Sequence, residues 1–158
     1  ADGRFEVGLV HTWGDVALAL PEHLVRTSVA SDVADVIVHA DDPLAGRTRL
    51  TPHDLVEEQW IATPEGTICR QWLSRMYDGT GHRPQIAHES MEYASHLALV
   101  RAGLGIALVP RLGRGELGPG LVAVPAHDPV PTRDVVAVHR RTMSRSPAVL
   151  ALVAGLSR

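Results

Sequence analysis

The stretch HLALVRAGLGIALVPRLG, residues 96–113, decides the fold of this chain. A run with helical spacing ends at Ala102, two glycines follow one residue apart, and an apolar run then leads to Pro110. A dinucleotide-binding loop needs its glycines after a strand and before a helix, so that the helix amino terminus meets the phosphates. Here the order is reversed, so we expect Gly103 to end a helix and Gly105 to open a strand. The glycines are also too close together for the dinucleotide fingerprint, and the chain has no lysine for a phosphate-binding loop.

The segments around this stretch alternate between strands and helices. Apolar runs predict strands at 59–63, 84–89, 105–110 and 121–126, and helical spacing predicts helices at 66–79 and 91–102. Towards the amino terminus we expect strands at 5–11, 23–30 and 32–39, a turn at Ser31-Asp32, and a short helix at 51–58. Towards the carboxyl terminus we expect a proline-broken linker at 127–131, a strand at 133–140 and a helix at 147–156. This alternation is typical of an α/β protein with a mostly parallel, doubly wound sheet.

The composition excludes several classes of protein. The 158 residues fit one domain or two small lobes, and 45% hydrophobic with 21% charged residues is ordinary for a globular chain. The net charge of −3 gives no basic footprint for nucleic acid. No apolar run approaches the ~20 residues of a membrane span, so we expect no membrane contact. Cys69 is the single cysteine and no signal peptide is visible, which favours a reducing, cytoplasmic setting. We interpret Cys69 as a small apolar helix residue rather than as a reactive thiol.

The sequence contains no pattern typical of catalysis. None of the nine histidines lies three or four residues from another, so none pair on a helix turn as metal ligands do. The serine-nucleophile and zinc-protease motifs are both missing. The carboxylate pairs Asp41-Asp42 and Glu57-Glu58 fall on stretches that we expect to be exposed. We therefore predict a protein that is not an enzyme, with no catalytic residue, no metal and no cofactor.

Two strand ends remain as candidates for ligand binding. In an open α/β sheet, ligands bind outside the carboxyl ends of the strands. The segments TPEG (63–66) and ESM (89–91) each follow a predicted strand and open a helix, so they offer unpaired backbone N–H groups to a small anion. Thr63 and Ser90 add hydroxyl groups. The alternative is that both segments only cap their helices.

Five segments in a fixed order resemble the effector-binding region of a LysR-type transcriptional regulator, and the resemblance covers essentially the full chain. They are DDPLAG (41–46), TPHDLVEEQWI (51–61), HLALVRAGLGIALVPRL (96–112), GLVAVP (120–125) and DVVAVHRRTMSRSPAVLALVAGL (134–156). The GLGIALVP segment and the PLA loop are the most specific of these motifs. The first strand differs slightly, since Glu6 stands where the family often has aspartate.

The resemblance implies a fold like that of the type 2 periplasmic binding proteins. Two α/β lobes would be joined by two crossovers, with a small effector, such as a carboxylate or another anion, between them. Lobe I would comprise residues 1–50 and 127–158, and lobe II residues 51–126. The module would sense its effector, pass lobe movement on to control transcription, and form a homodimer.

The resemblance also implies which residues bind the ligand. Seven positions follow strand ends that face the cleft in the family: Thr12, Trp13, His39, Thr63, Pro64, Ser90 and Met91. For two of them a structural role is an open alternative, since His39 could be a satisfied histidine at a strand end and Trp13 could be a core residue.

The chain departs from the family at its amino-terminal end. The family begins with a winged helix-turn-helix, a linker helix and the first strand–helix units of lobe I, and this sequence has no counterpart of them. We therefore expect DNA contact only through such an N-terminal domain, and an incomplete lobe I whose apolar surface is covered by a partner chain or by altered packing. The alternatives are a solute-binding protein of a transport system and, on the same scaffold, an enzyme.

Overall fold

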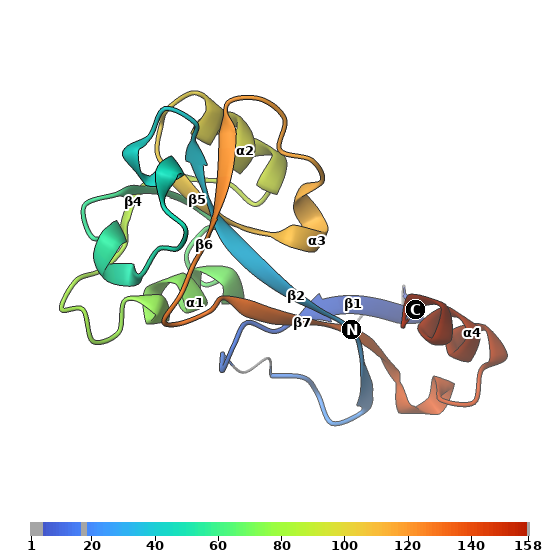
Figure 1. The fold of residues 1–158 in the computed structure, drawn as a ribbon. Coiled ribbons are helices and arrows are strands. Elements are labelled where there is room, and N and C mark those ends of the chain that lie inside the picture. Colours follow the sequence, from blue (N-terminus) through green and yellow to red (C-terminus); the bar gives the residue numbers. More distant parts are fainter. Residues whose placement is uncertain (1–4, 17–18, 158) are drawn as a thin grey trace. The chain divides into compact units, whose positions relative to one another are not determined.

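A computed structural model describes residues 5–16 and 19–157, and it divides the chain into two compact units. Figure 1 shows the fold along the chain. Residues 1–32 and 132–158 form the smaller unit, and residues 33–131 form the larger one. These boundaries differ from those expected from the sequence, because residues 33–50 and 127–131 pack with the larger unit.

The smaller unit is built on antiparallel strands. Strand β1 (Val7–His11) pairs antiparallel with β7 (Thr132–Arg140), and β7 is also the neighbour of β2 (Leu24–His39). A 3₁₀ turn (Arg141–Met143) and helix α4 (Pro147–Leu156) follow β7, as the Ser146-Pro147 pair predicts. Several large apolar side chains of this unit are exposed: Phe5, Leu9, Leu150 and Leu152.

Strand β2 is continuous, so the turn predicted at Ser31-Asp32 is wrong. The Ser31 hydroxyl donates to the carboxylate of Asp134 at 2.6 Å. The Asp32 carboxylate accepts two hydrogen bonds from the Arg133 guanidinium, at 2.8 and 3.0 Å. Both partners lie on β7, so the polar pair that resembles a turn in the sequence consists of cross-strand contacts.

The larger unit contains a mixed sheet with the strand order β6–β2–β5–β3–β4. Its strands besides β2 are β3 (Gln59–Ala62), β4 (Gln85–Glu89), β5 (Ile106–Pro110) and β6 (Leu121–Pro125). β3 runs parallel to both β4 and β5, but β2 is antiparallel to β5 and β6. The mostly parallel sheet expected from the sequence is therefore corrected to a mixed one.

Helices α1 (Ile68–Met76) and α2 (Tyr93–Arg101) cover opposite faces of this sheet. Neighbouring residues of a strand point to opposite faces. Trp60 bonds to Tyr77 at the end of α1, while Ile61 packs in a buried cluster with Val100 of α2. The sheet is thus doubly wound, as predicted. No helix within the described ranges combines the length and apolar character needed to cross a membrane.

The helix predicted at 51–58 is much shorter than expected. The structure has a 3₁₀ helix at Pro52–Leu55, and a second one at Pro43–Gly46. The Asp54 carboxylate accepts from both the N–H and the hydroxyl of Thr51, at 2.8 and 2.7 Å. These bonds close a single turn, after which the chain turns into β3.

The glycines of residues 103–105 form the predicted helix-to-strand turn. Gly103 has φ +72°, its N–H donates to the carbonyl of Val100, and the N–H of Leu104 donates to that of Leu99. This is the bonding pattern of a Schellman cap. Gly105, with φ +137°, lies so close to β3 that a Cβ atom there would be 2.5 Å from the Gln59 carbonyl oxygen. Strand β5 then begins at Ile106.

A buried chain of hydrogen bonds links α1 to the face of the sheet that this helix covers. The Trp60 indole N–H donates to the Tyr77 hydroxyl at 2.7 Å, and that hydroxyl donates to the Leu55 carbonyl at 2.9 Å. Burial raises the pKa of Tyr77 to about 12, so the phenol keeps its proton. Both side chains are almost completely buried.

Replacing Tyr77 with phenylalanine should therefore cost about 2 kcal/mol of unfolding free energy, since it leaves a buried donor and a buried acceptor without a partner. Urea unfolding followed by tryptophan fluorescence measures this loss. Tyr93→Phe is the matched control, because the Tyr93 hydroxyl is only partly buried and lies 3.7 Å from the Cys69 sulfur. An equal loss in both variants would contradict the assignment.

Candidate ligand-binding site

The carboxyl ends of the parallel strands in the larger unit bring two of the predicted segments together. β3 ends at Ala62 and β4 at Glu89, and these residues are paired across the two strands. The N–H of Ser90 donates to the Ala62 carbonyl at 3.0 Å. Thr63 and Ser90 therefore begin two adjacent loops at one edge of the sheet, each leading into a helix.

The Thr63 loop is held by a chain of hydroxyl groups. The Thr67 hydroxyl donates to the Pro64 carbonyl at 2.8 Å, and its oxygen accepts from the Arg70 N–H at 3.3 Å as the cap of α1. Because the Thr67 proton is committed, the Thr63 hydroxyl is the donor in the 2.8 Å contact between the two threonines. Thr63 is 7% exposed.

Arg70 joins the two loops and was missed by the sequence analysis. Its guanidinium donates to the Thr63 carbonyl at 3.2 Å and to the Glu89 carboxylate at 3.0 Å. The Arg70 side chain is only 17% exposed. An arginine in the first turn of a helix that follows a strand was the available signal, but its partner on β4 is 19 residues away.

The Ser90 loop rests on a buried histidine, which was also missed. The His96 Nε2 lies 2.9 Å from the Ser90 carbonyl oxygen, so Nε2 carries the proton in this bond. His96 is 1% exposed and its ring packs edge-on against Tyr93 at 5.6 Å. Met91, in contrast, is 63% exposed.

Burial lowers the pKa of His96 below its ordinary value of 6.5. The unfolded chain then binds the proton more readily than the folded chain. The free energy of unfolding therefore falls as the pH drops from 6.5 towards the folded-state pKa, and the total loss is about 1.4 kcal/mol for each unit by which folding lowers the pKa. His96→Gln keeps a donor for Ser90 but does not titrate, and its urea midpoint should fall less than that of the parent between pH 7.5 and 5.5. His11, whose pKa burial also lowers, contributes to the slope in the same direction. The exposed His53→Gln is the control, and an unchanged slope in His96→Gln would contradict this role.

The end of β5 carries a second buried network. The short helix α3 (Arg111–Arg114) follows β5 directly. Arg111 donates two hydrogen bonds to the Asp35 carboxylate, at 2.7 and 2.8 Å, and Arg114 donates a third at 2.6 Å. Burial alone would raise the pKa of Asp35, which is 2% exposed, but the arginine hydrogen bonds outweigh it and lower the pKa.

The remaining predicted residues do not lie at this edge. His39 ends β2, and because β2 is antiparallel to β5, His39 lines a pocket with Gln59 and Gly105 at the opposite edge of the larger unit. Its Nδ1 accepts from the Asp41 N–H at 3.2 Å.

Thr12 and Trp13 belong to the smaller unit. Trp13 is 1% exposed, and the Arg133 guanidinium lies 5.9 Å from the centre of its ring. The Thr12 hydroxyl accepts from the Asp134 N–H at 3.2 Å.

The doubly wound sheet and the two loops at its carboxyl edge define an α/β domain of the ligand-binding type. The family model described as LysR substrate binding domain matches residues 1–158, so the chain belongs to that family. The small neutral protease regulatory protein of Streptomyces coelicolor is 31% identical over 105 residues, which cover 65% of this chain and 31% of the relative. The chain thus spans about a third of the length of the curated relatives it matches.

Solved structures share the fold. A putative LysR family transcriptional regulator from Pseudomonas aeruginosa superposes with a TM-score of 0.83 at 18% identity, covering 98% of this chain and 54% of that one. The CcmR regulatory domain of Synechocystis, in complex with 2-PG, gives 0.80 at 17% identity, covering 98% and 73%. The type 2 periplasmic-binding-protein-like fold predicted from the resemblance is confirmed.

Proposed function

We propose that this chain is the effector-sensing domain of a LysR-type transcriptional regulator, and that its ligand binds at the carboxyl edge of β3 and β4. The observation that carries the proposal is the convergence of the Thr63 and Ser90 loops, each of which leads into the amino terminus of a helix.

The proposed ligand is a small carboxylate or another small anion. The amino termini of α1 and α2 favour negative charge. The related CcmR regulatory domain was solved with a small ligand, 2-PG, which supports a small-molecule effector. The proposed contacts are Thr63, Pro64, Ser90 and Met91. His39 is left out because it lies at the opposite edge, and contacts by Thr12 and Trp13 stay a separate prediction.

In this proposal the domain performs no chemistry. Ligand binding favours one arrangement of the two lobes, and in the whole protein that preference passes to a DNA-binding domain elsewhere in the regulator. The whole protein would act in the cytoplasm, where its DNA target is found.

We also propose that the domain forms a homodimer. Its support is the set of exposed apolar side chains on the smaller unit, since exposed apolar surface commonly marks an interface. Sedimentation velocity should give a dimer for the chain and a larger monomer fraction for Leu150→Glu/Leu152→Glu. A monomer at every concentration would overturn this part of the proposal.

A thermal-shift screen of small carboxylates and aromatic acids on the full-length regulator tests the binding site. Ligands that raise the melting temperature should lose most of this effect in Thr63→Val and Ser90→Ala, because each substitution removes a hydroxyl from the edge. Ser95→Ala is the matched control, since Ser95 is an exposed serine in α2. If Thr63→Val and Ser90→Ala leave every stabilisation unchanged, the ligand does not bind at this edge.

A further inference from the structure

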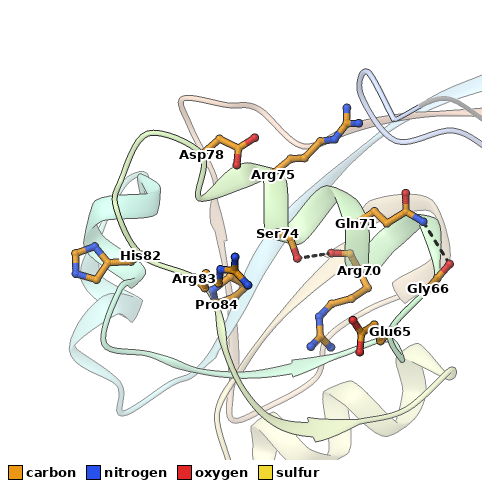
Figure 2. A pocket seen from close by; sticks show the side chains of 10 residues that line it. All are labelled: Glu65, Gly66, Arg70, Gln71, Ser74, Arg75, Asp78, His82, Arg83 and Pro84. Atoms are coloured by element: carbon orange, nitrogen blue, oxygen red, sulfur yellow. Dashed lines mark hydrogen bonds between the residues drawn. The ribbon is translucent and has the colours of Figure 1, made fainter.

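A polar groove of about 750 Å³ begins at Glu65 and Gly66, in the loop that follows Thr63, and runs along the outer face of α1. The side chains that line it come from three places: the turn before α1, the exposed face of the helix, and the segment that leads into β4. Figure 2 shows Arg70 and Arg83 towards the middle of the group, with Glu65 next to Arg70 in this view and Asp78 towards the far end of α1.

The groove is rich in arginine in a chain whose net charge is −3. Three guanidinium groups line it, those of Arg70, Arg75 and Arg83, together with the carboxylates of Glu65 and Asp78, and Arg70 is also paired with the Glu89 carboxylate at 3.0 Å. The His82 side chain also lines the groove. Within the described residues Arg83 has no ion pair, so the position beside Arg83, between it and Arg70, is the most favourable one for an anion.

The two central arginines come from segments that are fixed by hydrogen bonds. Arg70 is fixed by its bonds to Thr63 and Glu89. Arg83 follows a turn in which the Thr80 hydroxyl accepts from the His82 N–H at 3.0 Å and donates to the Tyr77 carbonyl at 2.8 Å. Within the described residues, Arg83 makes no hydrogen bond or ion pair of its own.

From these contacts we infer a second binding site, in which a phosphate or carboxylate group of a small metabolite lies between the guanidiniums of Arg70 and Arg83. A planar guanidinium donates two parallel hydrogen bonds to such a group, and two arginines from separate elements can hold it from both sides. The Ser74 hydroxyl, which donates to the Arg70 carbonyl at 3.1 Å, offers its oxygen to the polar remainder of the ligand.

This site is distinct from the proposed effector site but is connected to it. Arg70 lines the groove and also bonds the carbonyl of Thr63 at the strand end. An anion in the groove would compete with Thr63 and Glu89 for the Arg70 donors. Anion binding in the groove would therefore weaken the bonds by which Arg70 holds the loop that starts at Thr63.

Titration of the ¹⁵N-labelled 158-residue chain with inorganic phosphate, at an ionic strength kept constant with sodium chloride, tests this inference. The backbone amides of Gly66, Gln71 and Ser74 should shift and saturate. Arg83→Gln should weaken binding at least fivefold, and Ser74→Glu, which places a carboxylate in the groove, should abolish it. A parallel titration with succinate separates a phosphate site from a carboxylate site.

Arg49→Gln is the control, because it removes an exposed arginine outside the groove and should change the affinity less than twofold. Shifts that do not saturate, equal weakening in Arg49→Gln and Arg83→Gln, or shifts confined to the Thr63 and Ser90 loops would each overturn the proposal. Failure of the effector screen leaves this outcome unaffected.

Discussion

Replacing Gly105 with alanine is expected to destabilise the larger unit by about 4 kcal/mol. The new methyl group would lie 2.5 Å from the backbone carbonyl oxygen of Gln59, at the start of β3, and φ +137° is a conformation that alanine rarely adopts. A backbone atom of a central strand cannot move aside as the end of a flexible side chain can. Urea unfolding measures this loss directly, and in thermal unfolding we expect a melting temperature lower by roughly 10 °C.

Gly103→Ala is the matched control for this experiment. Gly103 also has a positive φ, +72°, but a Cβ atom there meets nothing within 4 Å. Only the cost of a left-handed backbone remains, about 1 kcal/mol. If the two variants lose the same stability, the close approach of the chain to Gln59 is not the constraint at Gly105.

In the double variant Arg111→Ala/Arg114→Ala the free energy of unfolding is expected to fall by about 3–5 kcal/mol, because the Asp35 carboxylate is left buried without a charged partner. Either single substitution should cost less, since one guanidinium still bonds the carboxylate. Arg49→Ala, which removes an exposed arginine elsewhere on the same unit, is the control for a general charge effect.

The pH dependence of this loss has a definite sign. In the parent chain the arginines lower the pKa of Asp35, so their stabilisation is present above its ordinary pKa of 3.8 and is lost as the pH falls through the folded-state pKa. In the double variant only burial remains and raises that pKa, so acid stabilises the variant. The difference in unfolding free energy between the parent chain and the double variant should therefore become smaller from pH 7 to pH 4. Adding Asp35→Val to the double variant should restore stability at pH 7, and a gap that widens in acid would contradict this account.

Much of the fold was predictable because its signals are local. The order of helix, glycine and strand at residues 96–110, and the Ser146-Pro147 start of α4, depend on neighbouring residues alone. β2 was divided into two strands because Ser31 and Asp32 have their partners on β7, about 100 residues away. Local sequence does not distinguish such cross-strand contacts from a turn.

The site was predictable only in part, for the same reason. Thr63 and Ser90 were found because each follows a strand and precedes a helix. His39 also lies at the end of a strand, but a sequence does not reveal that β2 runs antiparallel to β5, and this direction places His39 at the other edge. Arg70 and the Asp35–Arg111 pair join elements 19 and 76 residues apart, so no spacing rule pointed to them.

Strand β2 has a consequence for hydrogen exchange. Its first part belongs to the smaller unit and its second part, from Val33, to the larger one, although the strand has no break. Amide protons along a strand exchange at the rate at which their own cooperative unit opens. One uninterrupted strand should therefore show two levels of protection, and the step between them, near Asp32, would locate the boundary between the two units in solution.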